Sequence, residues 1–362
     1  MKKQKILILE LGGIGDVVMA LPALKGLVDL YRDDDLKILT VERTLPIVEQ
    51  IEYTHPTGFN VESVDVLRKG GFLSWLGLIR RLKREGYDTV IDLSAIERYL
   101  AGVRRYLFLK LLSVNEAIGR NTDGLGWAYT RSIDETLTSS EHEVERKLRV
   151  AELLGIKIGD KRPEMIIKDE EREWAEYLLK DLPEKGLVIG MNPGAYRPSR
   201  MWSVEKFKEI AQWLVEELSA SLLIMGGEKE KGLIENISMG LPEEKVVQCV
   251  GLAIPRLAAV MDRVSLLVTN DTGSMHVAAA VNTPIIALFG QTNFGRYHPY
   301  MDEERYVAIK KDCTVCPHTS FRNPMEECRR YSCNSQECMQ FISVEEVKSA
   351  VQTLIKGLGG RT

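Results

Sequence analysis

Short runs of Val, Ile and Leu alternate along this chain with longer segments of helical periodicity. The runs predicted to be β-strands are KILILEL, LKILTV, YDTVIDL, LVIGMN, SLLIMGG, SLLVTN and PIIALFG. Continuous apolar strands that alternate with helices indicate parallel sheets covered by helices on both faces. The alternation occurs twice, from Lys5 to about Arg120 and from Leu187 to about Gly290, so the sequence predicts two α/β halves.

The stretch between the halves is charged and of helical periodicity. It includes EHEVERKLRVAELLGI and a helix from Asp169 to Leu179, and we expect the interdomain connection near Asp160 to Pro183. The expected domains are residues 1–170, residues 171–342 with a cysteine-rich segment at 313–338, and a final helix within 343–362. Because ligands of such sheets bind outside the carboxyl ends of the strands, the residues directly after each strand are the candidate site.

Composition narrows the class of protein. Hydrophobic residues make up 44% and charged residues 28% of the 362 positions, as in an ordinary globular protein. A formal net charge of -4 provides no general attraction to nucleic acid, so we expect no nucleic-acid partner. The apolar run from Ile6 to Leu9 ends at Glu10, which is too short for a signal peptide, and the expected location is cytoplasmic.

The first strand is followed by LELGGIGD, a glycine-rich turn into a helix. Gly13 and Gly15 match the start of a dinucleotide fingerprint, but Val18 stands where its third glycine belongs. Asp16 would also place a negative charge where a pyrophosphate should bind, which disfavours a dinucleotide. Gly12 and its neighbours would instead let another molecule approach the backbone closely. Asp16 then either accepts a proton from that molecule or caps its own helix.

Three strand ends of the second half carry the residue types that a diphosphate requires. Hydroxyls, a glycine and helix amides bind phosphate oxygens, arginine adds paired donors, and a glutamate can accept hydrogen bonds from ribose hydroxyls. Each residue alone also fits a solvated loop or an ordinary capped helix. The candidates are Arg197 and Arg200 after LVIGMN, Glu228 after SLLIM, and Asp271, Thr272, Gly273, Ser274 and His276 after SLLVTN.

The chain resembles glycosyltransferase family nine, the ADP-heptose:lipopolysaccharide heptosyltransferases, in four segments that occur in the same order. These segments are LGGIGDVVMALPAL, NPGA with the later RMW, MGGEKE and VTNDTGSMHVAAAVNTPIIALFG. The resemblance implies a GT-B fold, in which two Rossmann-like domains with parallel sheets face a central cleft. It also implies that the acceptor binds mainly to the first domain and the nucleotide sugar to the second. A final helix would cross back to the first domain, and transfer would need no metal.

The resemblance implies a role for each matching residue. Asp16 would be the catalytic base, Arg200 would meet the donor phosphates, and Glu228 would contact the ribose. Asp271, Thr272, Gly273 and His276 would line the donor pyrophosphate and sugar. The basic position before Trp202 is often lysine in the family, and Met201 fills a place that is often polar. Because Asp271 would repel phosphate, we expect its carboxylate to contact sugar hydroxyls or backbone amides.

The implied reaction is inverting transfer of heptose from ADP-heptose to the lipopolysaccharide inner core, with a lipid-linked phosphorylated saccharide as acceptor. Two alternatives remain open from the sequence. The chain could use another nucleotide sugar or a protein acceptor, or it could bind a nucleotide sugar without turnover.

Five cysteines lie close together near the C-terminus. Four or five thiolates in one short segment match a structural zinc or iron site, although reduced or disulfide-paired cysteines fit equally well. His318 could replace one ligand, or it could be a surface histidine. The cysteines are Cys313, Cys316, Cys328, Cys333 and Cys338.

A basic stretch runs from Arg80 to Arg120, with nine Lys or Arg against five Asp or Glu. Within it, RRYLFLKLL interleaves basic and apolar residues. Such a surface would suit the lipid-linked acceptor or peripheral contact with the anionic inner membrane. A buried helix with a solvated basic edge fits the same pattern.

Overall fold

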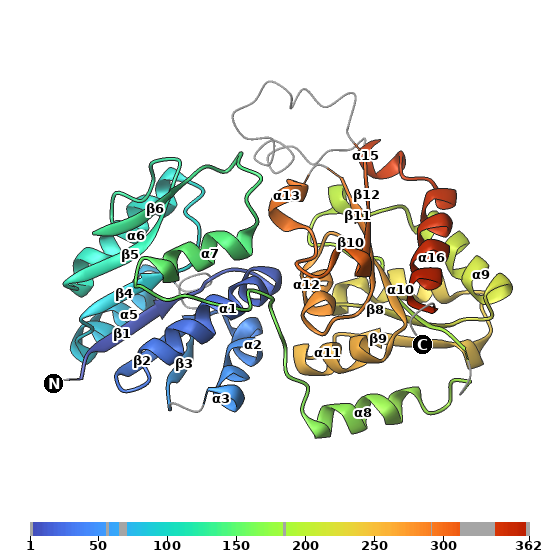
Figure 1. Cartoon of the computed structure of the whole chain (residues 1–362), viewed down its shortest axis with the longest axis horizontal. Coiled ribbons are helices and arrows are strands. Elements are labelled where there is room, and N and C mark those ends of the chain that lie inside the picture. Colours follow the sequence, from blue (N-terminus) through green and yellow to red (C-terminus); the bar gives the residue numbers. More distant parts are fainter. Residues whose placement is uncertain are drawn as a thin grey trace. The chain divides into compact units, whose positions relative to one another are not determined.

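The computed structural model describes residues 3–55, 58–64, 71–183, 186–290, 292–311 and 337–359. The chain forms two units, Met1–Glu164 and Met165–Thr362, each built on its own six-stranded parallel sheet (Figure 1). This confirms the predicted α/β class with two Rossmann-like domains. The division falls a few residues before the expected boundary at 170, because α8 (Asp169–Leu179) packs as a whole on α11 (Ile254–Arg263) of the second unit.

The sheet of the first unit has the strand order β3-β2-β1-β4-β5-β6. Leu7 of β1 lies opposite Lys37 of β2 on one side and opposite Val90 of β4 on the other. The strands are β1 (Lys5–Leu9), β2 (Asp35–Thr40), β3 (Asn60–Ser63), β4 (Thr89–Asp92), β5 (Glu116–Thr122) and β6 (Arg131–Glu135). The helices are α1 (Ile14–Leu30), η1 (Glu42–Thr44), α2 (Leu45–Glu49), α3 (Ile51–Thr54), α5 (Phe72–Glu85), α6 (Tyr99–Leu112) and α7 (Glu143–Glu152).

The two faces of this sheet are covered by different helices. Leu7 and Leu9 of β1 pack in one cluster with residues of α5 and α6. Since side chains alternate along a strand, Ile6 and Ile8 point to the opposite face, where α1 and α7 pack together. All four side chains are almost completely buried, which explains why β1 is a continuous apolar run.

The sheet of the second unit has the order β12-β11-β10-β7-β8-β9, the same topology as the first. Its strands are β7 (Val188–Asn192), β8 (Ser221–Gly226), β9 (Val246–Val250), β10 (Leu266–Asn270), β11 (Ile285–Phe289) and β12 (Tyr306–Lys310). Besides α8 and α11, the helices are η2 (Pro198–Arg200), α9 (Val204–Glu217), η3 (Glu228–Glu230), α10 (Lys231–Ser238), η4 (Glu243–Lys245), α12 (Gly273–Ala280), α13 (Phe294–Tyr297), η5 (Glu303–Arg305), α15 (Glu337–Gln340) and α16 (Val344–Gly359).

The last helix, α16, belongs to the core of the second unit. Val347 and Val351 are fully buried in one cluster with residues of α9 and α10. Trp202 packs edge-on against Phe207 of α9 and donates a hydrogen bond from Nε1 to the Ile342 carbonyl oxygen, 2.9 Å away. The apolar stripe of α16 thus fills the sheet face of its own unit, and the crossing of a final helix to the first domain stays a prediction.

No helix in the described ranges is both long and apolar enough to cross a membrane.

Candidate functional site

The topology of the first sheet identifies where a ligand of this unit would bind. The strand order reverses between β1 and β4, and ligands of doubly wound sheets bind outside the carboxyl ends of the strands at such a point. The loop after β1 contains Gly12 and Gly13, and Gly15 lies in the first turn of α1. Leu11 N donates a hydrogen bond to Ser94 Oγ beyond β4, 3.0 Å away, so the two strand ends are joined.

Asp16 caps the first turn of α1. Its Oδ2 accepts a hydrogen bond of 2.8 Å from the amide of Gly13, the N-cap residue. A Cβ at Gly12 would lie 2.3 Å from the Asp16 Cβ, so the fold of this turn admits only glycine there. The side chain is half-buried, and no hydrogen bond from the described residues reaches Oδ1. The cap therefore fixes the carboxylate and leaves one oxygen available as a proton acceptor.

Glu10 lies beneath this loop and is fully buried. Its Oε2 is 2.6 Å from Lys147 Nζ of α7, and its Oε1 accepts a hydrogen bond of 3.1 Å from Gly12 N. Burial raises the pKa of Glu10, the positive charge of Lys147 lowers it, and the negative charge of Asp16 raises it. The Glu10–Lys147 pair thus ties α7 to the glycine loop, a link that sequence reasoning missed.

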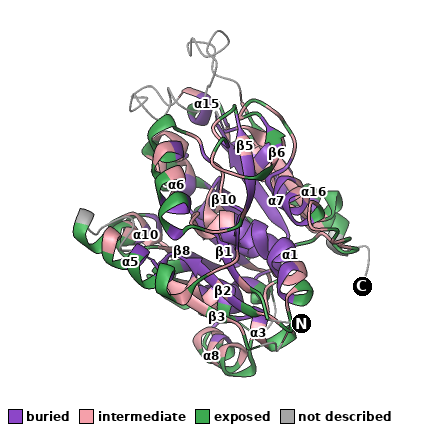
Figure 2. Cartoon of the chain, turned by 90° about the vertical axis from the view of Figure 1, so that its left-hand side faces the viewer, coloured by how far each residue is buried: buried purple, intermediate pink, exposed green. Residues whose placement is uncertain are grey.

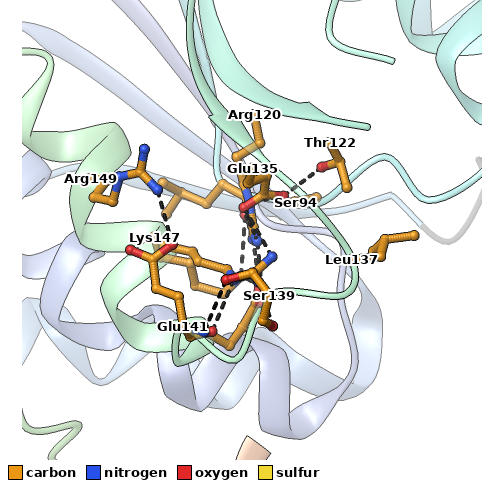
Figure 3. A network of polar contacts seen from close by, with 12 residues as sticks. Ser94, Arg120, Thr122, Glu135, Leu137, Ser139, Glu141, Lys147 and Arg149 are labelled. Atoms are coloured by element: carbon orange, nitrogen blue, oxygen red, sulfur yellow. Dashed lines mark hydrogen bonds and ion pairs between the residues drawn. The ribbon is translucent and has the colours of Figure 1, made fainter. Parts of the chain in front are cut away.

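Lys147 belongs to a larger buried network in the first unit (Figure 3). Arg120 of β5 donates hydrogen bonds to Glu135 of β6, at 2.9 Å between Nη2 and Oε2, and also bonds the Glu143 carboxylate of α7. Its Nη1 donates to the Leu93 carbonyl oxygen, 3.1 Å away. Charges buried this completely persist only when they are paired, so the network fixes α7 against the ends of β4, β5 and β6.

In the second unit the strand order reverses between β7 and β10, so its ligand site is expected beside the loops after these strands. Asn270 at the end of β10 joins the two loops. Its Nδ2 donates to the Pro193 carbonyl oxygen at 2.8 Å, and its Oδ1 accepts from Trp202 N at 3.1 Å. Ser203 caps α9, with Oγ accepting a hydrogen bond from Lys206 N.

Arg200 and Asp271, predicted as donor contacts, lie next to each other. Arg200 Nη1 is 2.9 Å from Asp271 Oδ2, and the same oxygen accepts a hydrogen bond of 2.6 Å from Thr292 Oγ1. The Arg200 side chain is 24% exposed, against 6% for Asp271. The guanidinium offsets the charge that would otherwise repel phosphate. Thr292 follows β11 and was missed by sequence reasoning, because nothing near it in the sequence resembles a phosphate motif.

The start of α12 provides hydrogen-bond donors at the same end of the sheet. Thr272 is its N-cap residue, and the Thr272 Oγ1 is buried with no hydrogen-bond partner among the described residues. Gly273 and Ser274 begin the helix, where backbone amides have no intrahelical acceptor. His276 is buried in the next turn. A buried hydroxyl that lacks a partner suits an acceptor atom brought by a ligand, such as a phosphate oxygen.

Glu228 and Arg197 lie in the neighbouring loops. Glu228 follows β8 and is exposed, and a Cβ at Gly251 would lie 2.1 Å from its Oε1. The ion pair of Arg200 is with Asp271. Arg197 is half-buried and precedes η2, which contains Arg200.

The predicted cysteine site lies mostly outside the described residues. Cys313, Cys316, Cys328 and Cys333 belong to residues 312–336, as does His318. Cys338 of α15 is buried in the core of the second unit beside Met339. Among the residues that the structure does describe, no group of three or more His, Cys, Asp or Glu is arranged to hold a metal.

Comparison with known proteins agrees with this architecture. Residues 75–325 match the model of the family described as glycosyltransferase family 9 (heptosyltransferase). A lipopolysaccharide heptosyltransferase 3 of Escherichia coli K12 is 25% identical over 296 residues, which cover 80% of this chain and 83% of that protein.

Two solved structures share the fold over nearly their whole length. A family 9 glycosyltransferase of Veillonella parvula has a TM-score of 0.74 and 22% identity, with 97% of each chain covered. The E. coli ADP-heptose LPS heptosyltransferase II has a TM-score of 0.71 and 18% identity, with 99% of this chain and 100% of that chain covered. These likenesses confirm the predicted GT-B class of fold.

Proposed function

Because the chain belongs to glycosyltransferase family 9, we propose that it is an inverting transferase that moves heptose from ADP-heptose to the lipopolysaccharide inner core. The proposal is supported by the similarity to two E. coli proteins, a lipopolysaccharide heptosyltransferase 3 and the ADP-heptose LPS heptosyltransferase II. In the reaction an acceptor hydroxyl oxygen bonds to the anomeric carbon of heptose. The bond from that carbon to ADP breaks on the opposite face.

We propose that Asp16 removes the proton of the acceptor hydroxyl. The observation that carries this role is the carboxylate held by the Gly13 amide at the switch point of the first sheet, with Oδ1 available. Gly12 lets the Asp16 side chain lie against the loop, because a Cβ at position 12 would collide with it. Proton removal in the transition state makes the attacking oxygen a better nucleophile.

The second unit would hold the donor. Arg200 offers a charged donor to the diphosphate, while Thr272 and the amides at the start of α12 offer neutral ones. Groups fixed in advance near the leaving diphosphate stabilise the negative charge that develops on it, without a metal. Gly273, Ser274 and His276 would line the same part of the site, and Glu228 and Arg197 are proposed at its ribose and phosphate edges.

Substitution of Asp16 tests the reaction. Asp16→Asn keeps the size of the side chain and the oxygen that accepts from Gly13, but it removes the basicity. We expect the variant to fold and to bind ADP, and to lose about two to four orders of magnitude in transfer rate. The measurement is single-turnover transfer of heptose to lipopolysaccharide acceptor extracted from a strain that lacks inner-core heptose.

Asp29→Asn is the matched control for this substitution. Asp29 lies on the same helix, outside the glycine loop, and pairs with Arg32 on the surface. Its replacement should leave the transfer rate within a fewfold of the parent. A similar rate for Asp16→Asn would remove Asp16 from the chemistry.

The same assays distinguish the alternative functions. Transfer from another nucleotide sugar or to a protein would favour a different donor or acceptor, and ADP-sugar binding without turnover would favour a non-catalytic binding protein.

We propose that the enzyme works at the cytoplasmic face of the inner membrane, in peripheral contact with it. The support is the lipid-linked nature of the proposed acceptor, together with the basic and apolar stretch that follows Arg80.

We also propose that cysteines of the 313–338 segment hold a structural zinc or iron ion. The support is the CxxC spacing of Cys313 and Cys316 and the three further thiols within a short distance in the chain. Elemental analysis of protein purified without chelators should find about one equivalent of metal, and less in a Cys313→Ser/Cys316→Ser variant. Metal-free parent protein with full activity would contradict this assignment.

A further inference from the structure

Helix α6 of the first unit is apolar on both of its faces. Phe108 and Leu112 fill the core beneath it. On the outer side Leu100 is 70% exposed, Leu107 is 43% exposed and Leu111 is 38% exposed. The spacing of these leucines places them along one stripe of the helix. A surface helix of a globular protein normally exposes polar residues to water, so this outer apolar stripe indicates an interaction surface.

Aromatic side chains border the stripe. Tyr99 at the start of α6 is 68% exposed, and Trp127 in the loop between β5 and β6 is 46% exposed. The rings of Trp127 and Tyr106 pack with their centroids 5.0 Å apart, which fixes the tryptophan against α6. Tyr and Trp with one apolar and one wet side are the residues typical of the boundary between lipid and water.

The charged side chains of α6 itself are all basic. Residues 98–112 contain four Arg or Lys and no Asp or Glu. Arg105 turns inward to the buried Asp92, while Arg98, Arg104 and Lys110 are exposed. Lys110 Nζ lies 5.3 Å from the centre of the Tyr106 ring. Figure 2 shows exposed positions along α6 and the neighbouring α5.

We infer that the outer face of α6 docks on an anionic lipid bilayer. This α6 face consists of Tyr99, Leu100, Arg104, Leu107, Lys110, Leu111 and Trp127. The helix has 14 residues and is about 21 Å long, shorter than the roughly 30 Å hydrocarbon core, so it would lie in the interface. The inference deepens the proposed function, because it names the surface that brings the enzyme to a lipid-linked acceptor.

A second copy of the chain is a poorer occupant of this face. In a two-fold symmetric dimer the same patch meets itself, which would bring Arg104 and Lys110 towards their own copies. Anionic headgroups instead provide the opposite charge beside a layer that accepts leucine and aromatic side chains.

Vesicle binding tests the inference without donor or acceptor. We expect the full chain to sediment with phosphatidylcholine vesicles that contain phosphatidylglycerol, to bind pure phosphatidylcholine weakly, and to be released by salt. Leu100→Gln/Leu107→Gln should lower partitioning about tenfold or more, since each buried leucine contributes strongly. Arg104→Gln/Lys110→Gln should lower it about fivefold per charge. Tyr177→Gln/Met239→Gln, which removes exposed apolar residues elsewhere, should bind as the parent does.

Enzyme assays separate this inference from the proposed function. The leucine variant should transfer heptose to detergent-dispersed acceptor at the parental rate and to vesicle-embedded acceptor more slowly. The inference would be overturned if the leucine variant bound vesicles as well as the parent, or if the parent did not bind them at low salt. Neither outcome would contradict the proposed heptose transfer. Light scattering could instead show that the parent is a dimer and that the leucine variant is a monomer. This result would assign the face to a second copy of the chain and would also overturn the inference.

Discussion

At the scale of single residues, the Asp16 carboxylate caps its helix, and this contact is compatible with the proposed role as a base. The hydrogen bond from Gly13 is an ordinary capping contact, yet it uses only Oδ2. A cap that fixes the carboxylate also sets its position, and a general base must lie within reach of the proton that it removes. The contact between Asp16 and Gly12 explains why a glycine precedes the cap, since a Cβ would displace the carboxylate.

The buried Glu10–Lys147 pair should make folding stability depend on Lys147. Lys147→Met leaves a carboxylate without its counter-charge, and we expect the free energy of unfolding at neutral pH to fall by about 3–5 kcal/mol. The pKa of Glu10 is already raised by burial, so the folded chain holds more protons than the unfolded chain above pH 4.5, and stability falls as pH rises through that window. Loss of Lys147 raises the pKa of Glu10 further, so the destabilisation should grow with pH. The check is the free energy of unfolding in urea, measured for parent and variant at several pH values.

Two controls separate this electrostatic effect from lost packing. Glu10→Gln/Lys147→Met removes both charges and should recover most of the stability with a flatter pH dependence. Lys231→Met breaks a surface ion pair with Glu235 and should leave the free energy of unfolding nearly unchanged. A loss for Lys147→Met that is constant with pH would show that methylene packing, and not the charge of Glu10, dominates.

At the scale of elements, sequence patterns found the central strands and missed the others. Each of the seven predicted strands is present, from β1 to β11. The four edge strands β3, β6, β9 and β12 were missed. β3 and β6 are mostly polar, so no apolar run marks them. β9 and β12 do contain short apolar runs, VVQCV and YVAIK, which the prediction did not use. β5 was missed because it buries Arg120 and Thr122. Their partners, Glu135 and Glu143, come from other elements and satisfy these polar groups only in the folded chain.

The candidate site was predictable to the extent that it lies directly after strands. The loops with Asp16 and Asp271 follow strands that the apolar pattern identifies, so their position was expected. The contacts of these residues were not. Thr292 reaches Asp271 from the end of a different strand, and Lys147 reaches Glu10 across 137 positions of the chain. Such pairings depend on strand order, which local patterns do not encode.

At the scale of the whole molecule, the same topology occurs twice, with different side chains at its two switch points. Both sheets have their switch point between the first strand of the unit and the strand that starts its second half. In the first unit this point presents the Asp16 carboxylate, and in the second it presents Arg200 and the Thr272 hydroxyl. A base in one unit and anion-binding groups in the other fit an acceptor and a diphosphate donor held by separate units.

This division predicts that ADP stabilises the second unit independently of Asp16. ADP at about one hundred times its dissociation constant should add about 2.7 kcal/mol to the free energy of unfolding, in the parent and in Asp16→Asn alike. Hydrogen exchange should slow around residues 193–204 and 271–281 and remain unchanged around residues 11–20. Arg200→Ala should weaken ADP binding about tenfold to a hundredfold, since a charged hydrogen bond contributes about 1.5–3 kcal/mol.

Arg263→Ala is the control for this substitution, because Arg263 pairs with Glu176 on the surface of the same unit and should leave ADP binding unchanged. Arg200→Lys should lose less affinity than Arg200→Ala, because it keeps a positive charge beside Asp271 and the diphosphate. Parental ADP affinity in Arg200→Ala would remove Arg200 from the donor site. Slower exchange around residues 11–20, or an ADP effect that disappears in Asp16→Asn, would mean that the nucleotide contacts the glycine loop and that the two roles are not divided between the units.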